Sequence, residues 1–486
     1  MGLAFVPVYI KFLGMEAYGL IGIFAILQAW LTLLDLGMTP ALAREMARFT
    51  AGAHNAESIR DLLRSLEIIG IGIASAIIFG VHASAHWLAS AWLKAEHLPI
   101  GVVTHALAAM GVVTGLRFIE NIYTSSVAGL QRQVLQNVVT SVMATARALG
   151  AVAVLAWISS TIEAFFIWQC VISLVTIPLL AALVYGKLPR ATRAARFSLP
   201  ALRNVWRFAA GMLAITALSL LLTQVDKILL SRLLSLQDFG YYALAGMLAN
   251  TLFILAAPVN GAFYPRFTEL ATREDRAALR RVYHQAAQLI TVTVGSAAVV
   301  SMVFGDRLLM LWSANPVLTQ HVAPLLGIIT GGTLLNALMG IPYEMQLAHG
   351  WTSLTIRVNV VAVSLLIPAI FWVAPHYGAI GAAWVWVTLN ACYLLFVIYY
   401  MHLRILKEDK WRWYGSDLAI PMLAAFAAAY VCRLIMPGNL GRFGEFVALL
   451  GGATTVFVSA SLAAPIVRHQ VSQLIRSKLA LMFEES

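Results

Sequence analysis

Charged residues are scarce in this sequence, and their scarcity excludes a water-soluble fold. Asp, Glu, Lys and Arg make up 11% of the 486 residues, hydrophobic residues make up 60%, and the mean hydropathy is +0.82. Soluble domains carry about 25% charged and roughly 45–50% apolar residues. We therefore expect the chain to lie in a membrane.

Cysteine and the common catalytic motifs are also lacking. The three cysteines, Cys170, Cys392 and Cys432, lie in apolar runs without the spacing of a disulfide framework or a metal site. There is no Gly-rich phosphate loop and no HExxH, CxxC or GxSxG motif. We expect buried free thiols, no metal, no cofactor, and a protein that is not an enzyme.

What the sequence does contain is a series of apolar stretches near 20 residues long, each able to cross about 30 Å of hydrocarbon as a helix. Alternating ten-residue strands are absent, which excludes a barrel. The prediction is an all-α integral membrane protein with about fourteen transmembrane helices. The expected spans are 1–12, 17–38, 66–88, 102–128, 134–157, 162–185, 208–230, 239–263, 284–304, 322–345, 355–374, 378–402, 415–435 and 445–467.

The first span is too short to cross, so we expect it to be truncated and the natural start to lie upstream of Met1. Two long basic segments interrupt the spans. Segment 186–207 reads as a linker, and segment 264–285 reads as an amphipathic helix on the membrane surface.

Basic residues set the expected topology. With the amino terminus inside, 24 of the 33 Lys and Arg fall in cytoplasmic segments and six in outer segments, while Arg117, Arg147 and Lys227 lie within spans. This bias follows the positive-inside rule and predicts two cytoplasmic termini. The net charge of +11 thus reflects topology and contact with membrane lipids, not nucleic acid.

An internal repeat indicates two related halves. FLGMEAYGLIGIFAI at 12–26 aligns with LLSLQDFGYYALAGM at 233–247, and each copy leads through a long span into a basic segment. We expect two pseudo-symmetric six-helix bundles plus two C-terminal helices, with the site between the halves. The expected domains are 1–185, a basic cytoplasmic linker 186–207, a second bundle 208–402, and two further helices with a cytoplasmic tail at 403–486.

Four motifs carry a family likeness over nearly the whole chain: FLGMEAYGL, LLDLGMTPALAREMAR, QVDKILLSRLLSLQDFGYYALA and HYGAIGAAW. In order and spacing they resemble the polysaccharide flippases of the multidrug/oligosaccharidyl-lipid/polysaccharide exporter superfamily. The resemblance implies a bacterial inner-membrane protein that flips an undecaprenyl-pyrophosphate-linked oligosaccharide for O-antigen-type lipopolysaccharide. It also implies a polysaccharide polymerase and a chain-length regulator as partners.

Ionisable residues inside spans are the candidates for function, because a charge at mid-bilayer costs about 2.5–3.5 kcal/mol on insertion scales. They should face the bundle interior or a wet cavity. Four spans carry polar stripes at helical spacing. The stripes are Gln28, Thr32, Asp35 and Thr39; Thr114, Arg117, Glu120, Asn121 and Thr124; Asn137, Thr140, Ser141 and Arg147; and Thr216, Ser219, Thr223 and Lys227, with Asp226 at the edge.

A basic interior suits an anionic cargo, because phosphate and pyrophosphate need Arg or Lys once they leave water. The substrate-binding candidates are Arg117, Arg147, Lys227, Asp226, Glu120 and Asn121. Among them, Asp226 is expected to hold Lys227.

Structural roles remain open for these residues. Arg117 and Glu120 could neutralise each other three residues apart, and Lys227 could snorkel to the outer interface. Asp35 and Glu344 are candidates for ion coupling, with helix-end roles as the alternative.

Two other functions fit the pattern less well. A sibling exporter would be a peptidoglycan-precursor flippase or an ion-coupled multidrug exporter, although a cation exporter calls for an acidic pocket. A membrane enzyme such as an O-antigen ligase or polymerase needs a long outer segment with clustered Arg, His or Glu, and the longest outer segments, 89–101 and 305–321, carry no such cluster.

Overall fold

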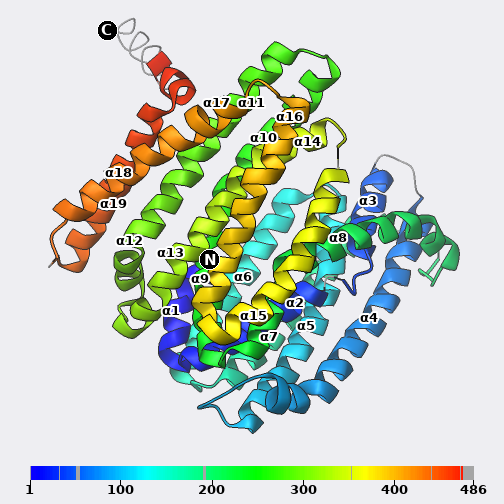
Figure 1. The fold of residues 1–486 in the computed structure, drawn as a ribbon. Helices are drawn as coiled ribbons and strands as arrows, with labels where there is room; N and C mark the ends of the chain where they lie inside the picture. Colours follow the sequence, from blue (N-terminus) through cyan, green and yellow to red (C-terminus); the bar gives the residue numbers. More distant parts are fainter. Residues whose placement is uncertain are drawn as a thin grey trace, which may run out of the picture. The chain divides into compact units, whose positions relative to one another are not determined.

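The computed structural model describes residues 2–31, 33–50, 55–189, 193–351, 353–438, 440–470 and 472–473. Within these ranges the chain is mostly helical and forms no strand (Figure 1), which confirms the all-α prediction. The three cysteines are free thiols, but the expectation that they are buried is wrong: Cys392 is exposed, and Cys170 and Cys432 are only partly buried.

The helices are α1 Gly2–Leu13, α2 Met15–Leu31, α3 Met38–Thr50, α4 Ala56–Trp87, α5 Ile100–Gly129, α6 Gln133–Trp157, α7 Ile162–Lys187, α8 Leu199–Leu233, α9 Leu236–Ala249, α10 Thr251–Thr272, α11 Arg276–Ile290, α12 Ser296–Ser313, α13 Pro316–Leu338, α14 Gly340–Ala348, α15 Ser353–Cys392, α16 Ile398–Ile405, α17 Lys410–Arg412, α18 Ile420–Ile435 and α19 Arg442–Ala463. Short π-helical segments lie at Leu88–Trp92, Thr291–Gly295, Tyr393–Val397 and Trp413–Ala419.

Ten helical segments of the described chain are long and apolar enough to cross a membrane. One of them, Ser353–Ile405, has 53 residues, which at 1.5 Å per residue would extend about 80 Å and is too long for one crossing. It reverses inside α15 at Gly378, whose φ of 59° and ψ of −148° are open to glycine but not to other residues. With α15 counted as two spans and α1, α2 and α8 added, there are about fourteen helices, of which α1, with 12 residues, is too short to cross by itself.

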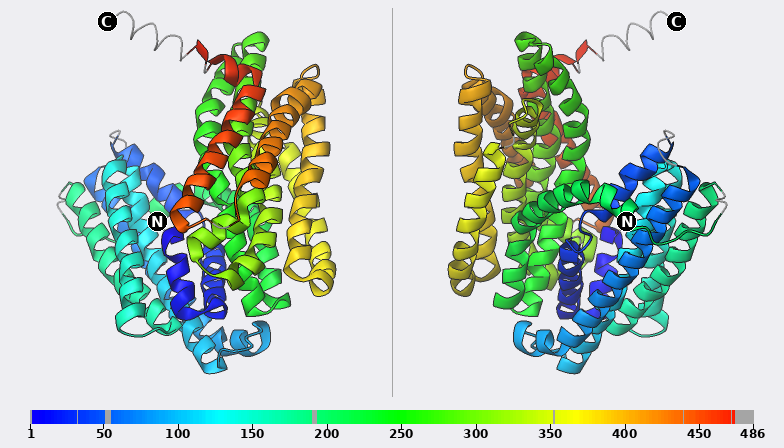
Figure 2. Two further views of the ribbon diagram at one scale, coloured as in Figure 1. Left: turned by 90° about the vertical axis from the view of Figure 1, so that its left-hand side faces the viewer. Right: turned by 90° about the vertical axis from the view of Figure 1, so that its right-hand side faces the viewer.

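The chain divides into two compact units, Met1–Gly240 and Tyr241–Ser486, here called unit 1 and unit 2. In unit 1, α5 is the central helix and packs against α2, α3, α4 and α7, while α6 packs on α7 and α1. In unit 2, α13 lies between α12 and α15, and α18 and α19 pack on each other and on α12 (Figure 2). The domain boundaries drawn from the sequence stay a prediction.

The expectation for the basic segment 264–285 is wrong in part. Segment 264–285 does not form one continuous helix. Its first part is the end of α10, which continues to Thr272, and its second part belongs to α11, which starts at Arg276. A tight turn separates them: Glu274 has a φ of 57°, and the Asp275 side chain accepts a hydrogen bond from the Ala278 amide at 3.0 Å. This is an N-cap, which starts a new helix.

In segment 186–207, α7 ends at Lys187 and α8 begins at Leu199, and the role of this segment as a linker stays a prediction. Arg193 bonds to Asp61 of α4, and Arg60 of α4 donates to the Pro189 carbonyl at 3.0 Å. These contacts tie the described parts of the connection to unit 1. Residues 190–192 lie outside the described ranges.

The two aromatic-Gly motifs of the repeat meet within unit 1. A Cβ on Gly19 of α2 would clash with the carbonyl oxygen of Leu236, at the start of α9. A Cβ on Gly240 would lie 3.0 Å from the Met15 carbonyl oxygen. Each glycine therefore allows the other copy's backbone to approach, so the repeat has a packing role.

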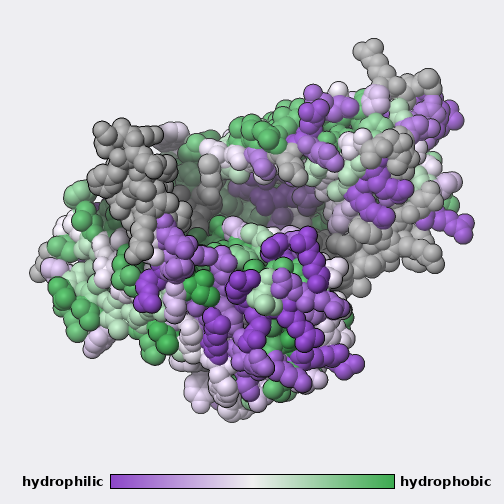
Figure 3. Space-filling model, turned by 90° about the horizontal axis from the view of Figure 1, so that it is seen from above, coloured by the Kyte–Doolittle hydropathy of each residue, from purple (hydrophilic) through white to green (hydrophobic). Residues whose placement is uncertain are grey.

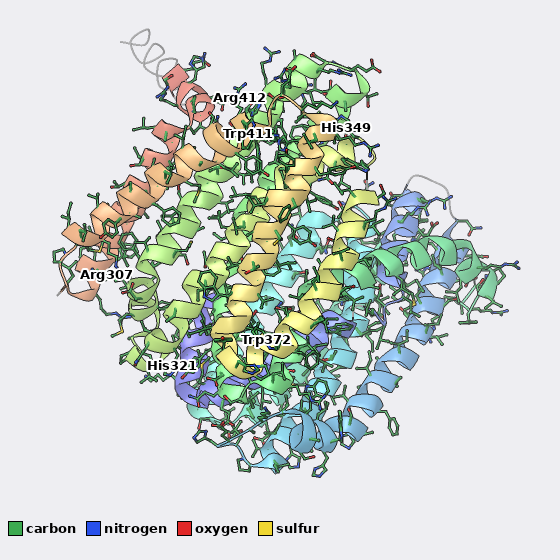
Figure 4. All side chains as sticks on the ribbon, viewed as in Figure 1. Arg307, His321, His349, Trp372, Trp411 and Arg412 are labelled. Carbon is green, nitrogen blue, oxygen red and sulfur yellow. The ribbon has the colours of Figure 1, made fainter. Side chains whose placement is uncertain are left out.

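Six labelled residues mark the two ends of unit 2. His349, Trp411 and Arg412 lie at one end, and Arg307, His321 and Trp372 lie at the opposite end (Figure 4). This is the alternation that the order of spans predicts. We call the first the basic end of unit 2, and the molecule seen from above, toward that end, shows many hydrophilic residues (Figure 3).

Candidate functional site

Polar side chains from four helices of unit 1 meet in its otherwise apolar interior. They come from α2, α5, α6 and α7, so the packing of α5 at the centre brings them together. We call this group the arginine cluster, and it consists of Gln28, Arg117, Glu120, Arg147, Gln169 and Ser173.

Arg117 lies near the middle of α5 and is held by amides. Its Nη1 donates to Gln28 Oε1 at 3.3 Å and its Nη2 to Gln169 Oε1 at 3.2 Å. Its guanidinium also lies 5.1 Å from the ring centroid of Phe24. No carboxylate within the described ranges is at ion-pair distance from Arg117. Its positive charge is therefore stabilised by the two amide side chains and by the Phe24 ring.

Arg147 of α6, in contrast, forms an ion pair with Glu120 of α5. Its Nη2 donates to both carboxylate oxygens of Glu120, at 2.6 and 2.8 Å, and to Ser173 Oγ at 3.1 Å. The side chains of Arg147 and Glu120 are 18% and 10% exposed. Glu120 therefore pairs across helices with Arg147, and the expected alternative of a pair with Arg117 within α5 is not what the structure shows.

The cluster contains two guanidiniums and one carboxylate, which gives it a net charge of +1. It also retains hydrogen-bonding capacity, because the buried Nε atoms of Arg117 and Arg147 have no partner among the described residues. A buried donor without a partner is costly. An anion with several oxygens would satisfy these donors and the uncompensated charge together.

Lys227 and Asp226 lie on α8, close to its end and apart in sequence from the cluster helices. Lys227 Nζ donates to the Thr223 carbonyl at 2.6 Å and lies 3.4 Å from Asp226 Oδ1. One turn further on, Trp92 Nε1 donates to Ser231 Oγ at 3.2 Å. The pair of Asp226 with Lys227 is as expected, and it sits in the last two turns of α8.

Three other candidates lie outside the arginine cluster. Asn121 is exposed on α5. Asp35 accepts from the Thr39 amide and hydroxyl, at 3.1 and 2.8 Å, and so caps the start of α3. Glu344 is half-buried on α14. Ion coupling by Asp35 or Glu344 stays a prediction.

Some members of the polar stripes fall elsewhere. Asn137, Thr140 and Ser141 are exposed on α6 and do not take part in the arginine cluster. Thr32 lies outside the described ranges, and so do the side chains of Thr216 and Ser219.

Sequence reasoning missed Gln169 and Ser173 of the cluster. Both are buried on α7, at 5% and 0% exposure, and with Thr176 they follow an i, i+4, i+7 spacing. This polar stripe on α7 could have indicated the two residues. It is a weak indication, because Ser and Thr in membrane helices often serve only in helix–helix packing.

A second buried polar network, in unit 2, was also missed. His284 of α11 is fully buried, with its Nδ1 against Asp417 and its Nε2 3.1 Å from Asp409 Oδ1. Gln288 donates to the other oxygen of Asp417 at 2.8 Å. Each ring nitrogen of His284 therefore faces a carboxylate oxygen. We call His284, Gln288, Asp409 and Asp417 the histidine network.

Comparison with known proteins places the chain in a family. The model of a family described as polysaccharide biosynthesis protein matches residues 1–271, more than half of the chain. The chain therefore belongs to this family, as the motifs predicted. No curated protein gives a significant sequence match.

Solved structures share the fold at low identity. The lipid II flippase MurJ, in an inward closed conformation, has a TM-score of 0.69 at 12% identity and covers 96% of this chain and 98% of its own. An inward-facing multidrug resistance MATE transporter of the MOP superfamily has a TM-score of 0.66 at 13% identity, and the match covers 84% of this chain and 94% of that chain. The MATE multidrug transporter DinF-BH has a TM-score of 0.56 at 13% identity, and the match covers 83% of this chain and 92% of that chain. At such identities the likeness shows the fold alone.

Proposed function

We propose that this protein is a flippase that moves an undecaprenyl-pyrophosphate-linked oligosaccharide from the inner to the outer leaflet of the bacterial inner membrane. The observation that carries the proposal is the arginine cluster, whose net positive charge lies among apolar helices. Membership of a polysaccharide biosynthesis family supports the sugar cargo, and the exporter fold supports transport rather than catalysis.

The chemistry of the cargo fits the cluster. A pyrophosphate linkage presents several oxygens and two negative charges, and planar guanidinium groups bind such oxygens two at a time. Arg117, which has no carboxylate partner in the described chain, would take a phosphate oxygen directly. Arg147 would do so with Glu120 keeping its orientation. The polyprenyl tail can stay in lipid while the head crosses.

Transport would then occur by alternating access, with the cluster exposed first to one side and then to the other. Asp226 and Lys227 are proposed as a secondary contact for the cargo on the outer side. The proposal includes two cytoplasmic termini, a polymerase and a chain-length regulator as protein partners, and membrane lipids as surroundings.

A peptidoglycan-precursor flippase is the nearest alternative, because its cargo carries the same pyrophosphate and the cluster does not distinguish the two. The family match favours the polysaccharide cargo. A cationic-drug exporter is disfavoured, because the cluster has more basic than acidic groups.

The test is complementation in a strain that lacks its own copy of this gene, with surface polysaccharide and membrane protein level both measured. We expect Arg117→Ala and Arg147→Ala to abolish surface polysaccharide at normal protein level. Arg117→Lys and Arg147→Lys should reduce it at least about tenfold, because the two-oxygen fork is lost although the charge stays.

The matched control is Arg232→Lys, since Arg232 is an exposed arginine of α8 that lies over the Trp92 ring at 5.0 Å. It should support full polysaccharide. Full polysaccharide from Arg117→Ala, Arg147→Ala and Lys227→Ala, each at normal level, would disprove the cationic site. Rescue of a peptidoglycan-precursor flippase mutant by this chain would assign it to that sibling instead.

A further inference from the structure

A large polar pocket opens at the basic end of unit 2, far in sequence from the arginine cluster. It has a volume of about 940 Å³ and lies between the start of α11, the end of α14, α16 and the turn that follows α16. Its charged lining residues are Arg276, Arg280, Arg404, Lys407, Glu408 and Asp409. Four bases against two acids give the pocket a net positive charge.

Both acids of the pocket are already compensated. Arg280 Nη1 donates to Glu408 Oε2 at 3.1 Å and its Nη2 to Asp409 Oδ1 at 2.8 Å, and His284 reaches Asp409 from inside. Burial raises the pKa of Asp409, but the hydrogen bonds from Arg280 and His284 outweigh it and leave this pKa below its ordinary value. Asp409 is thus a fixed anion that belongs to Arg280 and the histidine network.

Arg276, Arg404 and Lys407 remain, and none of them has a carboxylate at ion-pair distance in the described part of the chain. They come from different elements: α11, α16 and the turn after it. The Arg404 guanidinium stacks over the Trp351 ring at 4.3 Å from the centroid. Stacking fixes its plane while leaving its N–H groups free to bind oxygens at the edge.

Aromatic side chains lie in and next to the pocket, of which Trp351 lines it directly. Trp351 packs on Tyr400 with ring centroids 5.8 Å apart, and Lys410 lies 4.1 Å from the Tyr399 ring centroid. Trp411, at the same end as His349 in Figure 4, is 73% exposed. Tryptophan and tyrosine gather at the headgroup level of a bilayer. The pocket therefore lies where headgroups lie, with a polar interior and an aromatic rim.

We propose that this pocket binds the phosphate headgroup of an anionic phospholipid from the adjacent leaflet. Arg276, Arg404 and Lys407 contact the phosphate oxygens, and the acyl chains pass over the aromatic rim into the bilayer. Basic pockets between membrane helices are suited to such headgroups. The occupant joins α11, α14 and α16, and through Arg280 it borders the histidine network. The proposal is independent of the transported cargo.

The experiment uses the purified full chain in a neutral detergent. Phosphatidylglycerol, phosphatidylcholine or soluble glycerol phosphate is added, and both the thermal midpoint and the lipids retained in native mass spectrometry are recorded. We expect phosphatidylglycerol to raise the midpoint by several degrees and to be retained. At the same concentration, phosphatidylcholine should not raise the midpoint or be retained, because its headgroup has no net charge. Glycerol phosphate should not do so either, because it has no acyl chains to anchor it.

The variant is Arg276→Gln with Arg404→Gln, which removes two exposed charges without opening the interior. The control is Arg281→Gln with Arg412→Gln, which removes the same charge from exposed positions outside the pocket lining. The first should lose at least about tenfold in phosphatidylglycerol affinity and the second should bind as the parent does.

Two results would overturn the proposal. Equal loss in both double variants would mean general surface attraction and no pocket. Equal stabilisation by glycerol phosphate would make the ligand a soluble phosphate and not a lipid.

Discussion

Glu120 decides how much positive charge the interior of unit 1 carries. It holds Arg147 with two hydrogen bonds from one nitrogen, while Arg117, three residues away on the same helix, relies on Gln28 and Gln169. The two arginines therefore differ in what they would lose on mutation. Loss of the Arg147 side chain would leave the buried Glu120 carboxylate without its partner, whereas loss of the Arg117 side chain would leave only the amides of Gln28 and Gln169.

Glu120→Gln should destabilise the protein by about 3 kcal/mol, because removing one partner of a buried ion pair leaves the other charge without compensation. Arg117→Gln should cost much less, since its neighbours are neutral and can pair with each other or with water. The measurement is the thermal midpoint of each purified variant. Equal midpoints for the two would show that the pair contributes nothing beyond its neighbours.

The histidine network gives a sharper stability prediction in unit 2. His284→Ala would leave Asp417 and Asp409 buried beside an empty position, and we expect a loss of about 3–5 kcal/mol or failure to accumulate in the membrane. His349→Ala is the matched control, because His349 is exposed and its side chain bonds to the Met345 carbonyl of its own turn. A His284→Ala variant as stable as the control would show that the histidine network does not contribute to stability.

At the scale of helices, the spans could be predicted because hydrophobic length is written locally in the sequence. The side-chain partners could not. Glu120 and Arg147 pair only because α5 and α6 present these faces to each other, which depends on tertiary packing. His284 is separated from Asp409 and Asp417 by 125 and 133 residues, so no local pattern marked it. The turn at Glu274 was missed because a polar, amphipathic run looks continuous when its N-cap goes unnoticed.

The close approach of the repeat motifs leads to a prediction for α2. Gly19→Ala should destabilise the protein by about 1–3 kcal/mol, because the new methyl would meet the Leu236 carbonyl and the backbone would have to move. Gly72→Ala in α4 is the control, since a Cβ there meets nothing within 4 Å. Thermal midpoints of the two variants are compared. A Gly19→Ala variant as stable as Gly72→Ala would show that the backbones are further apart.

At the scale of the whole molecule, the charge bias and the opposite placement of Arg412 and Arg307 in unit 2 predict topology. Reporters fused after Arg196, Arg276 and Lys410 should read cytoplasmic. Those after Ala95, Asn315 and Pro437 should read periplasmic. At each site, one reporter that is active only in the cytoplasm and one that is active only in the periplasm are compared, so that each serves as the control for the other. A periplasmic reading after Arg196 would be incompatible with the order of spans.

The net charge of +1 on the arginine cluster has an electrical consequence for the proposed cycle. A pyrophosphate diester brings two negative charges, so the loaded cluster would carry a net charge of −1 and the empty one +1. Moving one elementary charge through the full membrane field is worth about 2.3 kcal/mol per 100 mV. In a cell that is negative inside, the voltage would push the loaded site outward and draw the empty site back. Each stroke would then be electrogenic in the direction of export, without any coupling ion.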